Sequence, residues 1–126
     1  MSQGDNQRSM QDIYAARLRG DLEGLCRQFS ATANFRLAGS GQSIPLAVSR
    51  SGAGEIRSLL RLLIKSFQLT DLTILAMLVD GSRAATHWSA KVHSRITGAT
   101  AETELMDLVE FKDGLVVDYL EFFVPS

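Results

Sequence analysis

Apolar residues recur along the first half of the chain at intervals of three and four, the spacing of helices that bury one face. The clearest stripe predicts a helix that lies on an apolar surface, and it comprises Ile56, Leu59, Leu60, Leu63, Ile64 and Phe67. An earlier stripe predicts a first helix behind an N-cap signal at Ser9, and it comprises Met10, Ile13, Tyr14 and Leu18. Gly20 and Asp21 then end that helix and begin a short second one. Residues 1–8 are expected to be a frayed lead.

Between the second and third predicted helices the pattern changes twice. Residues 33–37 alternate apolar and polar positions and predict a brief strand. Residues 39–54 are rich in glycine and serine and contain Pro45, so they predict a long loop with a short edge segment near residues 46–48. Long loops in compact domains are often mouths or lids of binding sites, and the sequence leaves the role of this loop open.

After Thr70 the apolar period falls to two, which is the period of strands. Four strands are predicted, over residues 72–79, 84–96, 101–112 and 115–124. Short glycine-containing turns join them into an antiparallel meander. Helices first and a sheet last are typical of an α+β fold in which helices pack on one face of a curved sheet. The length of 126 residues predicts a single domain over residues 1–126.

One acid, Asp107, interrupts the most apolar of these strands. Alternation gives one face of the last two strands Leu105, Asp107, Val109, Phe111, Val117, Tyr119, Glu121 and Phe123. Because a buried carboxylate must be paired, hydrogen-bonded or protonated, Asp107 has two interpretations. It faces a cavity and contacts a ligand, or it is a structural acid bonded to Tyr14, Tyr119 or the backbone. Glu121 shares its face, so two acids with separated pKa values would bracket a ligand.

The reverse side of the same strands is also partly apolar, with Met106, Leu108, Leu120 and Phe122. A single layer of helices covers only one face of a sheet. The second apolar face therefore predicts a partner, most simply an identical subunit in a homodimer formed through the outer face of the sheet.

Composition argues against several classes of function. Thirteen basic and fourteen acidic residues are dispersed along the chain, with a net charge of −1, and predict neither nucleic-acid nor membrane binding. Cys26 is the only cysteine and no long apolar run occurs, so we expect a cytoplasmic protein without disulfides. His87 and His93 would lie about 20 Å apart on one strand, too far to share a metal ion. No metal and no cofactor is predicted.

Several short motifs carry a resemblance to a known family. They are Gly20-Asp21-Leu22-Glu23-Gly24-Leu25, Ala33-Asn34-Phe35, Phe111-Lys112-Asp113-Gly114-Leu115-Val116 and Glu121-Phe122. With the order of elements, they resemble the nuclear transport factor 2-like superfamily, and within it the SnoaL-like and ketosteroid isomerase-like proteins. The resemblance covers about residues 10–124. It implies a cone-shaped α+β barrel with about three N-terminal helices on a strongly curved antiparallel sheet, a deep apolar cavity and, in many members, a dimer through the sheet's outer face.

The functional residues of the ketosteroid isomerase carry over only in part. The position of its general base is occupied by Leu37, so that base is absent. Its phenol falls at Ile13, one residue short of Tyr14, and the sequence leaves open which of the two faces the pocket. Its second acid, which donates a hydrogen bond to the oxyanion, matches Asp107. In that isomerase an apolar site keeps this acid neutral.

Limonene epoxide hydrolase, a relative in fold under the same resemblance, uses an arginine flanked by two acids. Its C-terminal acid corresponds to Glu121. The other two members fall near Trp88 and Ala90, which supply neither a cation nor an acid, so the triad is incomplete at these positions.

These observations favour a protein that binds a small hydrophobic molecule in an apolar pocket. The predicted walls are Phe35, Leu37, Trp88, Val109, Tyr119 and Phe123, and the candidate catalytic residues are Asp107, Tyr14 and Glu121. Two carboxyls and a phenol support cofactor-independent proton transfer, as in an isomerase, cyclase or dehydratase. The alternative is a non-catalytic ligand-binding or protein-interaction dimerisation module, which the loss of the base at Leu37 favours. The sequence does not identify the substrate.

Overall fold

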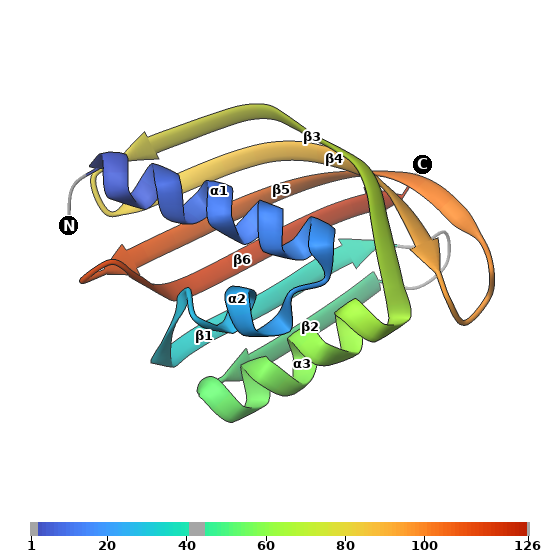
Figure 1. The fold of residues 1–126 in the computed structure, drawn as a ribbon, viewed down its shortest axis with the longest axis horizontal. Coiled ribbons are helices and arrows are strands. Elements are labelled where there is room, and N and C mark those ends of the chain that lie inside the picture. The colour runs from blue at the N-terminus through green and yellow to red at the C-terminus, as the bar shows by residue number, and fades with distance from the viewer. Residues whose placement is uncertain (1–2, 41–44, 126) are drawn as a thin grey trace.

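The computed structural model describes residues 3–40 and 45–125, which form one helical layer on one curved sheet (Figure 1). The helices within these residues are α1 (Gln3–Arg19), α2 (Leu22–Cys26) and α3 (Ala53–Ser66). The strands are β1 (Phe29–Ser40), β2 (Pro45–Ser51), β3 (Phe67–Asp80), β4 (Arg83–Ser94), β5 (Thr100–Lys112) and β6 (Leu115–Pro125).

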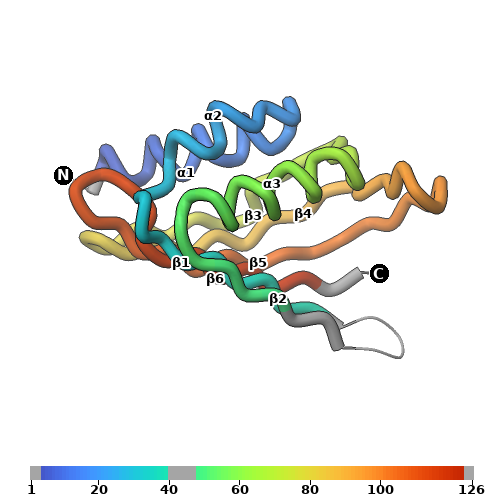
Figure 2. Tube along the Cα trace, turned by 90° about the horizontal axis from the view of Figure 1, so that it is seen from below, coloured from blue at the N-terminus to red at the C-terminus, as the bar shows by residue number. Residues whose placement is uncertain are grey.

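The six strands form one sheet in the order β2-β1-β6-β5-β4-β3. Strands β3 to β6 are the predicted antiparallel meander. Strand β1 joins them by pairing parallel to β6, and β2 folds back on β1 as an antiparallel edge strand. The helices lie on one face of this sheet (Figure 2). The α+β class is confirmed, and the shape is a curved, mixed sheet that stays open between its edge strands β2 and β3.

Helix α1 differs from the prediction at both ends. It begins at Gln3 rather than at Ser9, so the expected frayed lead is wrong over the described residues of that segment. The side chain of Asn6 is buried, and its amide donates to the carbonyl oxygen of Gly81 at 2.9 Å, which ties the first turns to the sheet. Leu18 does not continue the apolar stripe, because 46% of it is exposed.

The expected loop over residues 39–54 is also wrong in part. It contains the end of β1, strand β2 and the first two residues of α3, and residues 41–44 lie outside the described residues. The predicted edge segment near residues 46–48 is confirmed, as part of the longer edge strand β2. Strand β1 is twelve residues long rather than brief, because it pairs on both sides. Asp21 caps α2 as predicted, by accepting from the backbone N–H of Gly24 at 3.0 Å.

Register shifts interrupt the ladders of the described residues at four places, one in β1 with β6, two in β3 with β4 and one in β5 with β6. Opposite Ala90, strand β3 carries an extra residue, and Asp71 takes a positive φ of 51° there. In β6, Val116 pairs with Phe111 and Asp118 with Glu110, so Val117 is the extra residue. Val116 is therefore buried in place of Val117, the residue that unbroken alternation predicted.

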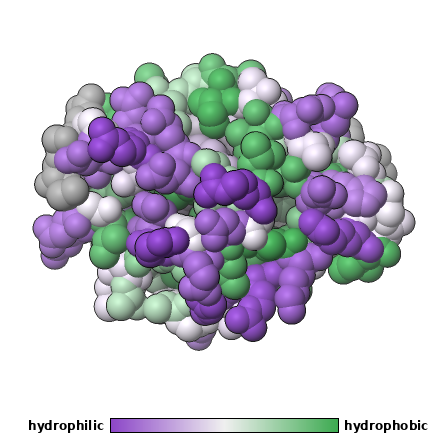
Figure 3. Space-filling model, in the orientation of Figure 1, coloured by the Kyte–Doolittle hydropathy of each residue, from purple (hydrophilic) through white to green (hydrophobic). Residues whose placement is uncertain are grey.

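The surface on the helical side is mixed in character. Hydrophilic side chains cover much of this face, and hydrophobic groups interrupt them (Figure 3). The buried core lies beneath, where one face of α1 and α3 meets the inner face of the sheet, and it includes Met10, Ile13, Ile56, Leu60, Trp88 and Val109.

Candidate functional site

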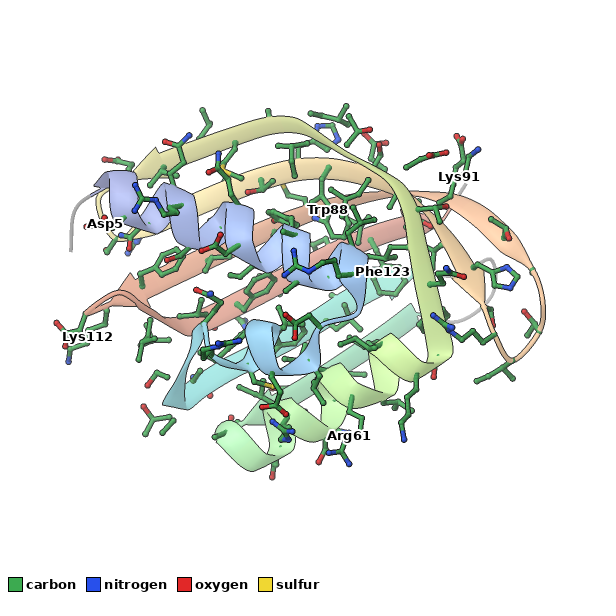
Figure 4. All side chains as sticks on the ribbon, viewed as in Figure 1. Asp5, Arg61, Trp88, Lys91, Lys112 and Phe123 are labelled. Carbon is green, nitrogen blue, oxygen red and sulfur yellow. The ribbon has the colours of Figure 1, made fainter. Side chains whose placement is uncertain are left out.

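A cavity of about 350 Å³ lies between the helices and the inner face of the sheet. Its walls are mainly aliphatic and aromatic, supplied by Leu25, Leu37, Leu60, Leu63, Ile64, Phe67, Leu69, Trp88, Val92, Ala99, Ala101, Leu105 and Phe123. Its polar lining residues are Arg17, Ser94, Thr103 and Glu121. Figure 4 shows the side chains that fill the space between helices and sheet, with Trp88 and Phe123 labelled. A mainly apolar hollow with a few polar groups is the usual form of a small-molecule site.

The cavity has an open end and a closed end. Among the lining residues only Phe67 and Ala99 are exposed, so the mouth lies between the start of β3 and the turn that joins β4 to β5. Arg17 and Glu121 belong to the closed end, since the side chain of Glu121 is only 2% exposed and that of Arg17 only 14%. A ligand that enters through the mouth therefore meets aliphatic walls before it meets charge.

Arg17 and Glu121 form a two-pronged ion pair at the closed end. Nη1 of Arg17 donates to Oε2 of Glu121, and Nη2 donates to Oε1 at 3.2 Å. The guanidinium also lies over the Trp88 ring, 4.9 Å from its centroid. Burial is the largest single influence and lowers the pKa of Arg17, but the charge and hydrogen bonds of Glu121, together with Tyr119 and Asp107, outweigh it, and the pKa is raised. Arg17 therefore stays a cation inside the protein.

Asp107 lies on the same inner face in a different environment. Its Oδ2 accepts hydrogen bonds from the Tyr14 hydroxyl at 2.6 Å, from Nε1 of Trp88 at 3.0 Å and from the Tyr119 hydroxyl. Its Oδ1 is buried and has no hydrogen-bond partner among the described residues. Burial, and then the charge of Glu121, raise the pKa of Asp107 well above its usual range. Since Oδ2 already accepts three bonds, a proton on this acid belongs to Oδ1.

The two phenols beside Asp107 are held in their protonated form. Burial is the main cause that raises the pKa of Tyr14, and the charge of Asp107 is the second. The same two causes, in the same order, raise the pKa of Tyr119. Both hydroxyls therefore act as hydrogen-bond donors, and with Trp88 they fix the orientation of the Asp107 carboxyl.

The predicted site residues divide into two groups. Glu121, Leu37, Trp88 and Phe123 line the cavity. The other five are buried behind its wall and are absent from its lining among the described residues: Tyr14, Phe35, Asp107, Val109 and Tyr119. Asp107 points inward, as alternation predicted, but its contacts with Tyr14 and Tyr119 are those of the structural interpretation.

The sequence left open whether Tyr14 or Ile13 faces the pocket, and the contacts of the two side chains answer this. The Tyr14 hydroxyl reaches Asp107, and Ile13 is buried in the core, so neither side chain lines the cavity among the described residues. Sequence reasoning missed Arg17, the cation at the closed end. Arg17 follows Met10, Ile13 and Tyr14 at the spacing of the apolar stripe, and a charge at such a position was the available signal.

Comparison with known families identifies the chain. The model of the SnoaL-like domain matches residues 10–119. The chain belongs to the SnoaL-like family. Among curated proteins no sequence matches it. The suspected relationship to nuclear transport factor 2-like and ketosteroid isomerase-like proteins is confirmed by this match and by the solved structures with the same fold.

Several solved structures share the fold of this SnoaL-like chain at low sequence identity. A Bacillus subtilis protein provisionally described as an isomerase has a TM-score of 0.82 and 17% identity, covering 98% of this chain and 89% of that one. A nuclear transport factor 2-like protein of Burkholderia xenovorans LB400 has a TM-score of 0.75 and 20% identity, covering 98% and 91%. An epoxide hydrolase of M. tuberculosis has a TM-score of 0.73 and 13% identity, covering 95% of this chain and 83% of that one.

None of the helices in the described part of the chain is long and apolar enough to cross a membrane. No group of three or more His, Cys, Asp or Glu side chains in residues 3–40 and 45–125 is arranged to hold a metal ion.

Proposed function

We propose that this SnoaL-like protein binds a small, largely apolar molecule in its cavity and transfers a proton on it through Glu121, without a cofactor. The observation that carries the proposal is the Arg17–Glu121 pair at the closed end of an otherwise apolar cavity. Structural neighbours described as an isomerase and an epoxide hydrolase support processing of a small molecule in general.

A buried ion pair contributes little to the stability of the folded state. Removing two charges from water costs free energy that their attraction often only offsets, and apolar side chains of the same volume are frequently as stable. A pair that opens onto a cavity is therefore a candidate for chemistry. Glu121 and Arg17 supply a carboxylate and a cation at the place where a ligand in this cavity must end.

The reaction that this geometry supports best is proton transfer beside a carbonyl group. Glu121 takes a proton from the carbon next to the carbonyl, and the electron pair of that C–H bond moves toward the carbonyl oxygen. The N–H groups of Arg17 that Glu121 does not use donate to this oxygen as negative charge develops. Where the substrate has a carbon–carbon double bond beside that carbon, Glu121 returns the proton to the far carbon of the double bond. The carbonyl re-forms and the double bond moves next to it, which completes an isomerisation.

Asp107 and Tyr14 have a different role in this proposal. Neither lines the cavity among the described residues, so we assign them as positioning residues. Asp107 holds Nε1 of Trp88, and Trp88 in turn lies against the guanidinium of Arg17. These contacts fix the position of the Trp88 ring, against which the guanidinium of Arg17 lies.

Epoxide hydrolysis is a second candidate, because Arg17 lies in the electrostatic field of both Glu121 and Asp107. This grouping is similar to the arginine and two acids expected of limonene epoxide hydrolase, although the cation comes from α1 rather than from the positions of Trp88 and Ala90. In this case Glu121 would take a proton from a water molecule whose oxygen bonds to a ring carbon, the C–O bond of the epoxide at that carbon would break, and Glu121 would return the proton to the alkoxide oxygen that forms.

Deuterium exchange tests the main proposal without knowledge of the product. Small apolar ketones are incubated with the protein in D₂O, and incorporation at the carbon next to the carbonyl is followed by mass spectrometry. We expect the protein to accelerate exchange, Glu121→Gln to abolish it and the exposed-site control Glu104→Gln to retain it. Ligand binding followed by thermal shift should survive in Glu121→Gln. Binding without exchange in the unaltered protein would favour the non-catalytic alternative, and binding with turnover of epoxides would favour the second candidate.

We also propose a homodimer through the outer face of the sheet. Apolar side chains are partly exposed there at Met106 (39%), Leu108 (45%) and Phe122 (42%), on adjacent strands. Light scattering should give twice the chain mass of 13.8 kDa, and Leu108→Lys should halve it. A particle of the single-chain mass at micromolar concentration would contradict this proposal. The cytoplasmic location stays a prediction.

A further inference from the structure

Exposed cations and exposed apolar side chains surround the mouth of the cavity. The last turns of α3 expose Arg61, Leu62 and Lys65, and Arg61 points outward from the helix (Figure 4). The turn between β4 and β5 exposes Arg95 and Ile96. This turn projects from the same end of the molecule as the junction of α3 with β3 (Figures 1 and 2).

Backbone contacts hold these two segments together. The N–H of Arg95 donates to the carbonyl oxygen of Ser66, the last residue of α3, at 2.8 Å. Phe67, which lines the mouth, pairs with Ser94. The end of α3 and the β4–β5 turn are thus joined at residues 66–67 and 94–95. We group the exposed side chains of these two segments as the mouth surface and define it as Arg61, Leu62, Lys65, Phe67, Arg95 and Ile96.

The charge of the mouth surface is of one sign. Residues 56–70 and residues 81–101 contain no acid. Nearby Arg57 pairs with Glu23 and Lys91 pairs with Asp71, whereas Arg61, Lys65 and Arg95 form no ion pair with the described residues. Along the chain basic and acidic residues look evenly dispersed, but folding gathers three unpaired cations at one end.

The apolar members of the mouth surface are unusually open to solvent. Ile96 is 79% exposed at the tip of the turn, Leu62 is 60% exposed and Phe67 is 39% exposed. Basic groups bind anionic headgroups, while projecting apolar side chains enter the boundary between headgroups and acyl chains. An acidic protein would explain the cations, but it would not explain apolar tips at the entrance of an apolar cavity.

We propose that the mouth surface docks on anionic lipid bilayers, so that the cavity opens toward the membrane. Docking would let an apolar molecule pass between the acyl layer and the cavity without crossing water. The proposal goes beyond the chemistry assigned to Glu121 and does not depend on it. Glu121→Gln should bind vesicles as the unaltered protein does.

Vesicle flotation tests this proposal directly. The full chain is mixed with phosphatidylcholine vesicles that contain or lack phosphatidylserine, at low and at high salt. We expect binding to the anionic vesicles at low salt, and its loss at high salt, where charges are screened. Replacing Arg61, Lys65 and Arg95 together with Gln should weaken binding roughly a hundredfold, at about fivefold for each cation. Ile96→Ser should weaken it several-fold while the salt dependence remains.

Matched variants separate the mouth surface from general charge and general hydrophobicity. Arg8, Arg27 and Arg83 are exposed elsewhere, so their replacement by Gln makes the same change in net charge. Leu78, which is 72% exposed near the other end of β3, is the control for Ile96 as Leu78→Ser. Both controls should bind like the unaltered protein. The proposal is overturned if anionic vesicles do not bind, or if either control loses as much affinity as its mouth-surface counterpart.

Discussion

Asp107 and Glu121 stand opposite each other on β5 and β6, and both are almost completely buried, yet their surroundings differ in kind. Asp107 is surrounded by neutral donors, the two phenols and the indole, and no cation bonds to it among the described residues. Glu121 is paired with the guanidinium of Arg17. Asp107 thus has only neutral hydrogen-bond donors, whereas Glu121 has a cation as its partner.

The difference shows how a single pair of strands can separate two carboxyl groups by function. Burial favours the protonated form of Asp107, because the charged form loses its hydration, although the hydrogen bond from Tyr119 acts in the opposite direction. The cation beside Glu121 offsets that loss at the neighbouring position. Of the two acids only Glu121 lines the cavity, so the acid that we propose to act on the ligand is the one that is paired with a cation.

Removing the cation should disturb this arrangement most. In Arg17→Met the carboxylate of Glu121 stays buried without a counter-charge, which is expected to lower the free energy of unfolding by about 3 to 5 kcal/mol. Urea unfolding followed by the fluorescence of Trp88 measures the change.

A double variant shows whether the lower free energy of unfolding comes from the unpaired charge of Glu121. Arg17→Met with Glu121→Leu removes both partners and should recover most of the lost stability. The exposed pair of Arg57 with Glu23 supplies the control, since Arg57→Met should cost less than about 1 kcal/mol. A double variant as unstable as Arg17→Met would mean that packing of Arg17, rather than its charge, matters.

At Asp107 the acceptor should matter more than the charge. At a pH below about 4, where folded and unfolded Asp107 are both largely protonated, Asp107→Asn keeps a carbonyl oxygen for the three donors and should cost about 1 kcal/mol. At the same pH Asp107→Leu fills the space but leaves the donors unsatisfied and should cost about 3 kcal/mol. Chemical denaturation of the two variants compares them. Equal costs would show that the site does not require an acceptor.

The pH dependence of stability distinguishes the two acids further. The pKa of Asp107 is raised in the folded protein, so the folded state keeps a proton that the unfolded chain releases above about pH 4. This stabilisation is fully present below that pH and is lost as the pH rises toward the folded pKa. Unfolding at several pH values above 4 should show the advantage over Asp107→Asn shrinking by about 1.4 kcal/mol per pH unit. Parallel curves would contradict a protonated Asp107.

Local periodicity predicted much of this fold. The stripe of α3 and the alternation of β3 to β6 are visible because burial repeats within each element. The parallel pairing of β1 with β6 joins residues that are about eighty positions apart, as in Phe35 with Tyr119, and no local pattern encodes it. The full length of strand β2 was missed for a related reason, since an edge strand in a glycine- and serine-rich segment has little alternation to show, and only its part near residues 46–48 was predicted.

The candidate site was predicted in outline and corrected in detail. Asp107 and Glu121 were found because acids stood at positions where the strand period requires burial. Arg17 obeys the same rule on a helix, but the apolar stripe was continued to Leu18, one position further. Glu121 lines the cavity and Asp107 does not, because the position of the cavity depends on how α1 and α3 pack on the sheet. Strand alternation contains no information about that packing.

The smallest effects are expected from the two phenols that share one oxygen of Asp107. Tyr14→Phe and Tyr119→Phe each remove one donor and should each lower the free energy of unfolding by about 1 kcal/mol, measured by urea denaturation. Three donors compete for the lone pairs of Oδ2, so the first loss is partly offset by the remaining bonds. The double variant should therefore cost more than the sum of the singles. Additive costs would mean that each phenol acts independently, and that Asp107 is held by separate bonds rather than by a network.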